Sequence, residues 1–464
     1  MYQGYSGTSM NPNPGKRGGP GRPGPGRGGP GGRARYKGGV GSPSPYPYHQ
    51  QPKRKGPKPP NRSGPRHNHL DGLPGTMPPV DPDFDPAFNG DLAAAQSSWL
   101  EVDGVLEMSP KGHGFLRSME RGLKPLSSDP FVPQQLIQAH KLREGLHIRG
   151  VVRPARGQGP RLGRIDQIEN APANEYKPRD FESLTAVDPT IAIRLETGQE
   201  PLSTRVMDLL TPLGRGQRAL IVAPPRTGKT VLLQQLAKAV SANHPDMHLM
   251  VLLVDERPEE VTEVRRTIRG EIFASSSDLD ASNHVRLAEL VVERAKRLAE
   301  QGKPVFLLLD SLTRLARAYN KNTGNSGRTM SGGVDVRALE VPKRLFGSAR
   351  AFEEGGSLTV VGTALIDTGS KMDEVIFQEL KGTGNMEMVL DRKLADRRVF
   401  PAMDISQSGT RKEERLISTE FLPRIHALRR VLVDMKPVEA MEKLVSRMAK
   451  TKSNTEFLEM IKLK

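Results

Sequence analysis

The chain of 464 residues is too long for a single hydrophobic core, so we expect two or three domains. It has no cysteine, which excludes disulfides, thiolate metal sites and cysteine nucleophiles and fits a cytoplasmic protein; it also has no apolar run near the ~20 residues that cross a membrane. The net charge is +16, but residues 1–70 hold 13 Lys and Arg and no Asp or Glu, which excludes a diffusely basic globular surface.

The N-terminal segment, residues 1–98, is predicted to be a disordered basic tail. Its first 70 residues contain 17 Gly and 14 Pro and lack the apolar content that offsets chain entropy. Residues 26–29 and 32–36 resemble RGG-type tails, in which arginine pairs with phosphate and stacks on bases. A solubilising linker is the alternative. Residues 71–98, rich in Pro and Asp, act as a spacer.

Two domains are predicted after the tail. Residues 99–168 contain short alternating apolar runs separated by Gly and Pro, which indicates a small β domain. Residues 169–205 are predicted to form a connector, and residues 206–464 are predicted to form an α/β domain. Its continuous apolar runs predict buried parallel strands interleaved with helices such as residues 285–300. Residues 417–464 are predicted to form the last helices of the domain. The predicted strands are residues 219–222, 249–254, 305–309 and 358–361.

The segment Ala223–Thr230 is predicted to be a P-loop that binds ATP. It follows a buried-strand pattern and opens a helix, so backbone N–H groups and a helix N-terminus would face the phosphates. Lys229 would neutralise the β- and γ-phosphate oxygens, and the Thr230 hydroxyl would ligate Mg²⁺. Ala223 replaces the first glycine of the usual pattern.

Two acidic residues follow the next predicted strands. Glu256 follows the strand that ends at Val254, and Asp310 follows the strand 305–309. In a parallel sheet both carboxylates emerge beside the P-loop. Asp310 would hold Mg²⁺ while Glu256 orients the attacking water, with Asp255 and Glu259 as rival bases. The alternative is that Glu256 and Asp310 cap the helices that follow them.

A candidate for the cation that approaches the γ-phosphate from a neighbouring subunit is Arg411. It lies in the segment 408–413, where Gly and Thr allow it to extend and Glu413 and Glu414 can restrain the segment. On residue type alone, an ordinary surface ion pair is the more usual role for such an arginine.

Five segments closely resemble the family of bacterial transcription termination factor Rho. They are residues 216–225, 254–263, 310–320, 363–374 and 381–387. The resemblance runs from about residue 102 to the C-terminus. It implies a RecA-like P-loop ATPase domain preceded by an OB-type β-barrel RNA-binding domain, in a homohexameric ring with ATP between subunits. It further implies an RNA translocase or helicase that loads on single-stranded RNA, moves 5′ to 3′ and terminates transcription by acting on the RNA polymerase elongation complex.

The resemblance also implies particular site residues in the motor. Arg411 would be a trans-acting arginine finger, and Phe400 would stack on adenine, although composition alone places it in a core. The nucleotide-binding residues expected are Gly214, Arg215, Gly216, Gln217, Arg218, Ala219, Arg226, Thr227, Gly228, Lys229, Thr230, Val231, Arg257 and Phe400.

RNA contacts are implied in the barrel and in two pore loops. The expected residues are Gly112, His113, Gly114, Phe115, Leu116, Arg117, Asp129, Pro130 and Phe131 in the barrel, and Arg328, Thr329, Met330, Ser331, Gly332, Gly333 and Lys371 in the pore. The family often has an aromatic pair where this chain has His113 and Phe115. It usually has lysine where this chain has Arg328, which keeps the charge but changes phosphate geometry.

Two other classes of protein remain open at this point. A rotary or secretion-type ATPase shares the fold and the P-loop but gives no reason for an OB domain preceded by a basic tail. A passive RNA-packaging protein would rest on the Gly/Arg/Tyr tail alone, and loss of Lys229 would then leave its activity intact.

Overall fold

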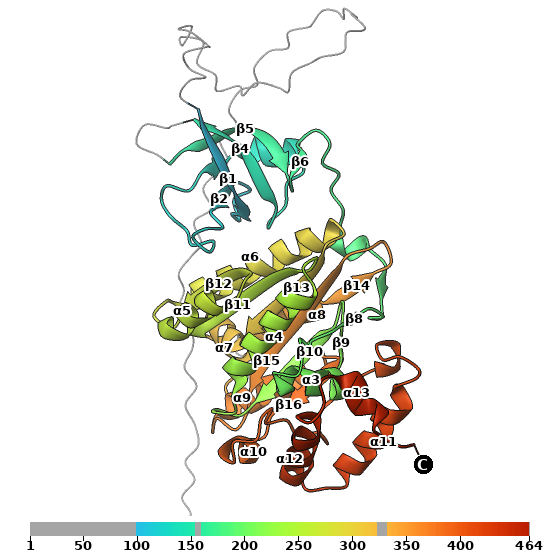
Figure 1. Cartoon of the computed structure of the whole chain (residues 1–464). Coiled ribbons are helices and arrows are strands. Elements are labelled where there is room, and N and C mark those ends of the chain that lie inside the picture. Colours follow the sequence, from blue (N-terminus) through green and yellow to red (C-terminus); the bar gives the residue numbers. More distant parts are fainter. Residues whose placement is uncertain (1–98, 154–158, 323–331, 464) are drawn as a thin grey trace, which may run out of the picture. The chain divides into compact units, whose positions relative to one another are not determined.

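The computed structural model describes residues 99–153, 159–322 and 332–463. The predicted tail at residues 1–98 and the pore-loop residues Arg328, Thr329, Met330 and Ser331 lie outside these ranges. Within them, a small β-barrel precedes a larger α/β domain along the chain (Figure 1). Among the described residues, no helix has both the length and the apolar content needed to span a bilayer.

The first domain is a closed barrel with one short helix. Its elements are β1 (Leu100–Met108), β2 (Gly114–Arg117), β3 (Phe131–Val132), α2 (Gln134–Ala139), β4 (His147–Arg153), β5 (Arg161–Ile168) and β6 (Ala171–Pro172). The strand order is β3-β2-β1-β4-β5-β6, and pairing of β3 with β5 closes the barrel. Side chains alternate across each strand, so Leu106, Leu116 and Ile148 fill the interior. The predicted OB-type barrel is confirmed.

Gly114 is needed where two barrel strands meet. A Cβ atom at this position would lie 2.6 Å from Leu106 Cδ1 and 2.8 Å from the Glu107 carbonyl oxygen. Any larger residue would therefore push β2 away from β1 and disturb the neighbouring pair of Glu107 with Phe115.

The second domain is built on a mostly parallel sheet in the order β12-β11-β13-β15-β10-β16-β17, in which β17 is antiparallel to β16. Its strands are β10 (Arg218–Ala223), β11 (His248–Glu256), β12 (Glu271–Ser276), β13 (Pro304–Asp310), β15 (Ser357–Leu365), β16 (Met386–Val389) and β17 (Gly409–Thr410). The four strands predicted from apolar runs are β10, β11, β13 and β15. The predicted RecA-like α/β fold is confirmed.

Helices cover both faces of this sheet, because successive strand residues point to opposite sides. Ala219 and Ile221 pack with α4 and the C-terminal helices, whereas Leu220 and Val222 pack with α6 to α9. The helices are α3 (Leu202–Leu210), α4 (Lys229–Asn243), α5 (Pro258–Thr267), α6 (Ala281–Glu300), α7 (Leu312–Asn322), α8 (Val336–Gly347), α9 (Lys371–Lys381), α10 (Arg392–Asp396), α11 (Leu422–Val433), α12 (Pro437–Met448) and α13 (Asn454–Glu459). Both faces of the strands are therefore apolar, which explains their continuous hydrophobic runs.

The segment predicted as a connector adds short pairings to the motor domain. They are made by β7 (Ala186–Val187) with β14 (Arg350–Phe352), and by β8 (Ala192–Ile193) with β9 (Leu213–Gly214). Two 3₁₀ turns, η1 (Phe181–Ser183) and η2 (Glu413–Arg415), complete the elements. Helix α3 runs across the predicted boundary between residues 205 and 206, so the position of that boundary stays a prediction.

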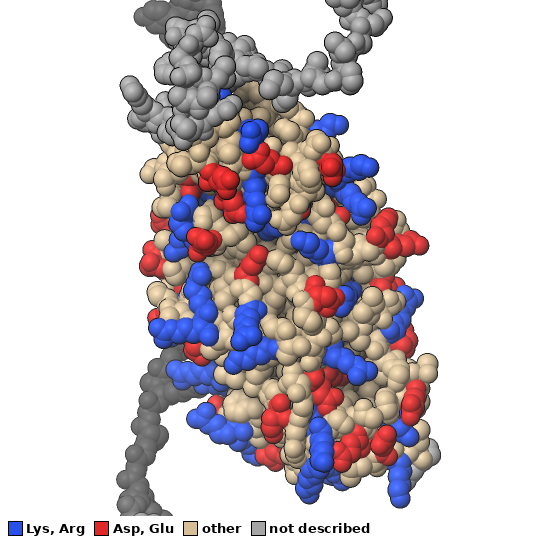
Figure 2. Space-filling model, turned by 45° about the horizontal axis from the view of Figure 1, so that its top comes forward, with Lys and Arg blue, Asp and Glu red and all other residues tan. Residues whose placement is uncertain are grey.

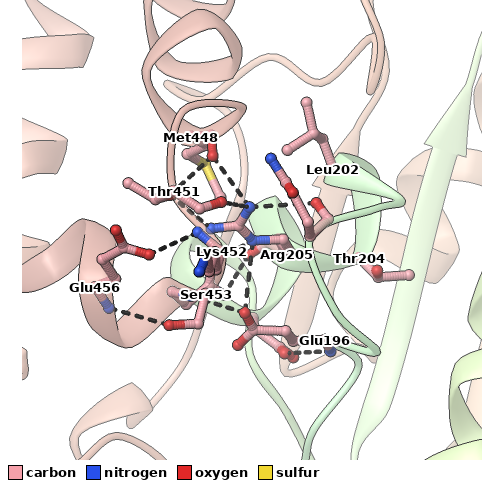
Figure 3. Close-up of polar contacts among 12 residues, drawn as sticks. Glu196, Leu202, Thr204, Arg205, Met448, Thr451, Lys452, Ser453 and Glu456 are labelled. Carbon is pink, nitrogen blue, oxygen red and sulfur yellow. Dashed lines mark hydrogen bonds and ion pairs between the residues drawn. The ribbon is translucent and has the colours of Figure 1, made fainter.

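A buried arginine fastens the C-terminal helices to α3 (Figure 3). Arg205 is completely buried, and its guanidinium donates to the carbonyl oxygens of Met448 at 3.1 Å and Thr451 at 3.0 Å. It also donates to the Thr451 hydroxyl at 2.9 Å and the Asn454 amide oxygen at 3.2 Å. A buried cation is tolerated only when its donors are satisfied in this way. Arg205 therefore fixes where α12 ends and α13 begins.

Ion pairs join the barrel to helix α6. Arg143 lies 2.7 Å from the buried Glu300, and Arg286 lies 2.9 Å from Glu107. Over the face drawn in Figure 2, basic and acidic side chains are interspersed.

Candidate functional site

The P-loop is the turn between β10 and α4. Gly228 has a left-handed backbone with φ of 84°, which a residue with a side chain rarely adopts, and it caps the N-terminus of α4. The Thr227 hydroxyl donates to the Pro224 carbonyl at 2.8 Å and holds the loop. The first helical residues, Lys229 and Thr230, therefore carry their side chains at a helix N-terminus that favours phosphate.

The structure brings the three predicted catalytic residues of one chain together. The Lys229 ammonium lies 2.5 Å from Asp310 Oδ1 and 3.5 Å from Glu256 Oε1. The strand order places β11 and β13 side by side, so their carboxyl ends deliver both carboxylates to the same edge of the sheet. Both carboxylates are buried. This arrangement fits a phosphate-binding and hydrolytic centre better than two separate helix caps.

Glu256 is held in a setting that suits a base. Burial, followed by the negative charge of Asp310, raises the pKa of its carboxyl above the ordinary value. The rival Asp255 is partly exposed and lies 3.9 Å from His284, and the rival Glu259 is exposed on α5. Of the three acidic residues, Glu256 is the one whose carboxylate contacts Lys229.

Two residues that sequence reasoning missed complete the cluster. The Thr363 hydroxyl donates to Asp310 Oδ1 at 2.7 Å, and Arg314 lies 3.3 Å from Glu256 Oε1. Thr363 comes from the apolar strand β15 and Arg314 from the first turn of α7, neither of which carries a recognisable phosphate motif. Both orient a carboxylate of the centre.

The oxygen donors at this edge suit magnesium. Thr230 supplies a hydroxyl and Asp310 a carboxylate, and Mg²⁺ is commonly held by one or two protein oxygens together with waters and substrate phosphates. Among the described residues, no group of three or more His, Cys, Asp or Glu side chains forms a cluster for a metal on its own. The donor set therefore fits a cation that arrives with a nucleotide.

A mostly apolar cavity of about 240 Å³ adjoins the P-loop. Phe400 forms one wall, and 42% of its surface is exposed, which is unusual for a phenylalanine and supports a stacking role rather than a place in the core. A Cβ atom on Gly228 would lie 3.1 Å from the Phe400 ring, so a larger residue would press on the ring. The cavity is lined by Ser203, Thr227, Gly228, Val231, Leu232, Gln235, Leu390, Phe400, Pro401 and Ala402.

The other predicted nucleotide ligands lie at two different ends of β10. Arg226 in the P-loop and Arg257 after Glu256 have exposed side chains at the same edge of the sheet. The structure does not bring the predicted ligands at residues 214–219 to the P-loop of the same chain. These residues precede or begin β10, whereas the P-loop follows that strand. Five residues of strand separate the two ends by about 16 Å. The group comprises Gly214, Arg215, Gly216, Gln217, Arg218 and Ala219, whose nucleotide contact stays a prediction.

Arg411 lies at this opposite end of β10. Its backbone N–H donates to the Asn385 carbonyl, and the Asn385 side chain accepts from the Arg218 backbone. Burial, together with the positive charges of Arg350 and Arg411, lowers the pKa of Arg218. The Arg411 side chain is exposed and has no hydrogen-bond or ion-pair partner among the described residues. It is therefore not an ordinary surface ion pair and cannot reach its own P-loop.

The aromatic residues predicted in the barrel form one cluster. The ring centroids of His113, Phe115 and Phe131 lie 5.1 to 5.8 Å apart, and all three rings are at least partly exposed. The Arg117 guanidinium lies 4.9 Å from the Phe115 ring. Such a group offers stacking faces for unpaired bases.

Three of the residues expected to contact RNA make contacts inside the barrel, and the RNA contacts of Asp129 and Arg117 stay predictions. Leu116 is 1% exposed in the barrel core, so its side chain is not available to a ligand. Asp129 is also buried and accepts from Arg117 at 2.7 Å and Arg121 at 2.9 Å. Arg117, paired with Asp129 and Glu107, is nearly buried and holds Phe115 in place. Sequence periodicity at Leu116 could have revealed its inward direction.

The described ends of the two predicted pore loops lie together. A Cβ atom on Gly332 would lie 2.9 Å from the Lys371 carbonyl oxygen, so the two segments touch through their backbones. The Gly333 carbonyl accepts from Asn320, and the Lys371 side chain is exposed at the start of α9. This contact brings together two segments that are far apart in the sequence.

The fold and the two sites define a RecA-like P-loop ATPase joined to an OB-type RNA-binding barrel. Residues 102–174 match the model of the Rho termination factor RNA-binding domain, and residues 203–410 match the nucleotide-binding domain of the ATP synthase alpha/beta family. Curated relatives named transcription termination factor Rho, from Salmonella typhimurium strain LT2, Escherichia coli strain K12 and Buchnera aphidicola subsp. Baizongia pistaciae, are each 51% identical over 367 residues. Each match covers 78% of this chain and 87% of the relative. The chain belongs to the Rho transcription termination factor family.

Solved structures show the fold of the motor domain more broadly. An ATPase from the type III secretion system of pathogenic bacteria is 23% identical with a TM-score of 0.51, covering 65% of this chain and 93% of its own. The assembled type III secretion ATPase of enteropathogenic E. coli is also 23% identical, with a TM-score of 0.50, covering 64% and 76%. This likeness reflects a shared fold, and membership of the Rho family decides against both alternatives left open by the sequence.

Proposed function

We propose that this protein is an RNA-stimulated ATPase that moves along nascent single-stranded RNA in the cytoplasm and terminates transcription at the RNA polymerase elongation complex. The observation that carries the proposal is the separation of two halves of one catalytic centre. Lys229, Asp310 and Glu256 converge at one end of β10, whereas the unpaired Arg411 lies at the other. A second subunit would complete the centre.

In this proposal each residue of the centre has one role. Lys229 binds the β- and γ-phosphates, and Thr230 and Asp310 would hold Mg²⁺, which supplies neutralisation of phosphate charge. Glu256 accepts a hydrogen bond from the attacking water and aligns it with the γ-phosphorus. Phe400 stacks on adenine in the apolar cavity. Arg226 and Arg257 approach the phosphates from the exposed edge.

Arg411 would act on the nucleotide of the neighbouring subunit. A surface that meets the opposite surface of an identical chain generates a ring when the rotation closes, and we propose a homohexamer. Gly214 to Ala219 lie at the same end as Arg411 and would border the same intersubunit nucleotide. Hydrolysis then depends on the alignment of two subunits, which RNA in the ring can control.

The RNA would be held at two places. The His113, Phe115 and Phe131 cluster captures unpaired bases, and its three rings offer stacking without requiring a particular sequence. Lys371 and the glycines Gly332 and Gly333 would face the strand inside the ring, and the RNA contacts predicted for Arg328 to Ser331 lie outside the described residues. Nucleotide-dependent movement of these loops would pull the strand.

A strand-displacement assay tests this function. The substrate is an RNA with an unpaired 5′ segment and a DNA oligonucleotide annealed towards its 3′ end. We expect ATP-dependent release of the DNA, little release when the unpaired segment lies on the 3′ side, and release of transcripts from stalled RNA polymerase by the same preparation. DNA release that is equal without ATP, or equal from both substrates, would refute directional translocation.

A further inference from the structure

A second aromatic and basic surface lies on the barrel outside the cluster already described. The Arg153 guanidinium stacks over the Trp99 indole at 4.6 Å from the ring centroid, and the Arg164 guanidinium lies at 6.0 Å. Trp99 is partly exposed, and both arginines are exposed. Neither the nucleotide centre nor the aromatic cluster uses these residues.

The strand register connects this surface to the aromatic cluster. Phe131 in β3 is paired with Arg161 in β5, and Arg161 is paired with Arg153 in β4. Leu100 is paired with Val152, so Trp99 lies beside Arg153 at the start of β1. Paired residues in adjacent strands point to the same face. Phe131, Arg161, Arg153 and Trp99 therefore form one row across the outside of the barrel.

The row has the dimensions and chemistry of a path for a single strand. Three strand spacings separate Phe131 from Trp99, about 14 Å in all. At the ~3.4 Å rise of stacked nucleotides this distance corresponds to roughly four nucleotides, and to fewer if the strand is extended. An aromatic face at each end with arginines between them matches a strand whose bases stack and whose phosphates meet cations.

Arg153 is free to take part. It has no ion-pair partner among the described residues, whereas Arg164 lies 2.7 Å from Asp166 and Arg149, on the same strand as Arg153, lies 3.0 Å from Asp103. A guanidinium stacked on an indole keeps its N–H donors at the ring edge, where a phosphate can be reached. The stack therefore holds the Arg153 side chain in position and leaves its N–H donors available to a phosphate.

We infer that Trp99 and Arg153 form a second RNA subsite, in which Trp99 stacks on an unpaired base and Arg153 binds a phosphate of the strand that the aromatic cluster holds. This inference rests on the proposed function, since it extends the RNA site of the barrel. It assigns the barrel a longer footprint than the aromatic cluster alone. It also gives the sole tryptophan of the chain a role in ligand binding.

The single tryptophan makes the subsite directly measurable. The full-length protein is titrated with a cytidine dinucleotide or a cytidine decanucleotide, without ATP, while tryptophan fluorescence and the anisotropy of a labelled decanucleotide are recorded. We expect the decanucleotide to quench Trp99 by at least half and the dinucleotide to bind without quenching. Trp99→Ala should weaken decanucleotide binding about 5- to 150-fold, the range for loss of one stacked base, and leave dinucleotide affinity unchanged.

Matched variants separate stacking from support of the fold. Trp99→Phe should restore most of the decanucleotide affinity, because a ring is retained. Arg153→Ala should weaken binding and lower the salt dependence by about one phosphate contact, whereas Arg149→Ala, on the same strand but paired with Asp103, should do neither.

Two results would overturn parts of the account separately. Decanucleotide binding with unchanged tryptophan fluorescence and an unaffected Trp99→Ala variant would show that Trp99 only anchors β1, and the subsite would be wrong. An absence of decanucleotide binding by the wild-type protein would instead refute the proposed function.

Discussion

The position of Arg411 predicts that removing it abolishes catalysis without loss of stability. The side chain is exposed and has no hydrogen-bond or ion-pair partner among the described residues, so Arg411→Ala should change the free energy of unfolding by no more than about 0.5 kcal/mol. An arginine that stabilises the transition state of phosphoryl transfer contributes roughly 10³- to 10⁵-fold to turnover. We expect RNA-stimulated ATP turnover to fall by at least 10³-fold while thermal unfolding is unchanged.

A subunit-mixing assay tests whether the arginine acts on a neighbour. Lys229→Ala rings lack the phosphate-binding lysine but retain Arg411, and Arg411→Ala rings have the reverse defect. In a random equimolar mixture, about a quarter of the intersubunit centres combine an intact P-loop with an intact arginine, because each centre uses opposite surfaces of two chains. The mixture should therefore recover ATP turnover far above that of either variant alone.

The mixing result has a clear contrary outcome. If Arg411 acted within its own chain, every centre in the mixture would lack one group, and turnover would stay at the level of the two parents. Mass spectrometry of the assembled particles serves as the control, since it shows whether the two variants share rings. Mixed rings without recovered turnover would refute the trans role.

Three further predictions follow from contacts in the motor and the barrel. Glu256→Gln should retain nucleotide binding but reduce turnover by at least about 10²-fold, measured by single-turnover hydrolysis, because an amide cannot accept the proton; unchanged turnover would favour Asp255 or Glu259 as the base. Arg205→Met should leave the buried carbonyls of Met448 and Thr451 without donors, cost about 3 kcal/mol and lower the thermal unfolding midpoint by roughly 5–10 °C, whereas the exposed Arg447→Met should not. Burial, then the charges of Glu293, Glu107 and Glu289, raise the pKa of Glu144 to about 7. Because the folded-state pKa is raised, ionised Glu144 destabilises the fold above pH 7 and the effect disappears as the pH falls to about 4.5. Glu144→Gln should therefore stabilise by roughly 1–2 kcal/mol at pH 8, after allowance for solvent screening, and by almost nothing at pH 4.5, as read from unfolding midpoints at the two pH values.

The sequence predicted that Lys229, Glu256 and Asp310 converge, because the signals for this convergence are local. A buried strand followed by Gly, Lys and Thr specifies a P-loop, and acidic residues at the ends of neighbouring strands converge wherever the sheet is parallel. These local signals were enough to predict that Lys229, Glu256 and Asp310 lie close together. Thr363 and Arg314 were missed because their contacts with Asp310 and Glu256 depend on the strand order and on the direction of α7. The sequence around each of these two residues predicts neither.

Other residues could be placed only with the structure. Phe400 has the composition of a core residue, but its segment crosses to the P-loop and leaves it 42% exposed beside a cavity. Leu116 stands within a motif of ligand-binding residues, yet strand alternation turns it into the barrel core. In the sequence, Trp99 marks only the start of the barrel domain. Its relation to Phe131 follows from barrel closure, which pairs strands distant in the sequence.

RNA-dependent ATP turnover of the purified full-length protein tests the central claim most directly. The claim is that a nucleotide centre shared between subunits hydrolyses ATP when RNA is bound. The account predicts at least tenfold stimulation of turnover by single-stranded RNA, and Lys229→Ala should lose turnover while still binding the same RNA. Turnover that is unchanged by single-stranded RNA, or a Lys229→Ala variant that hydrolyses ATP at the wild-type rate, would contradict it.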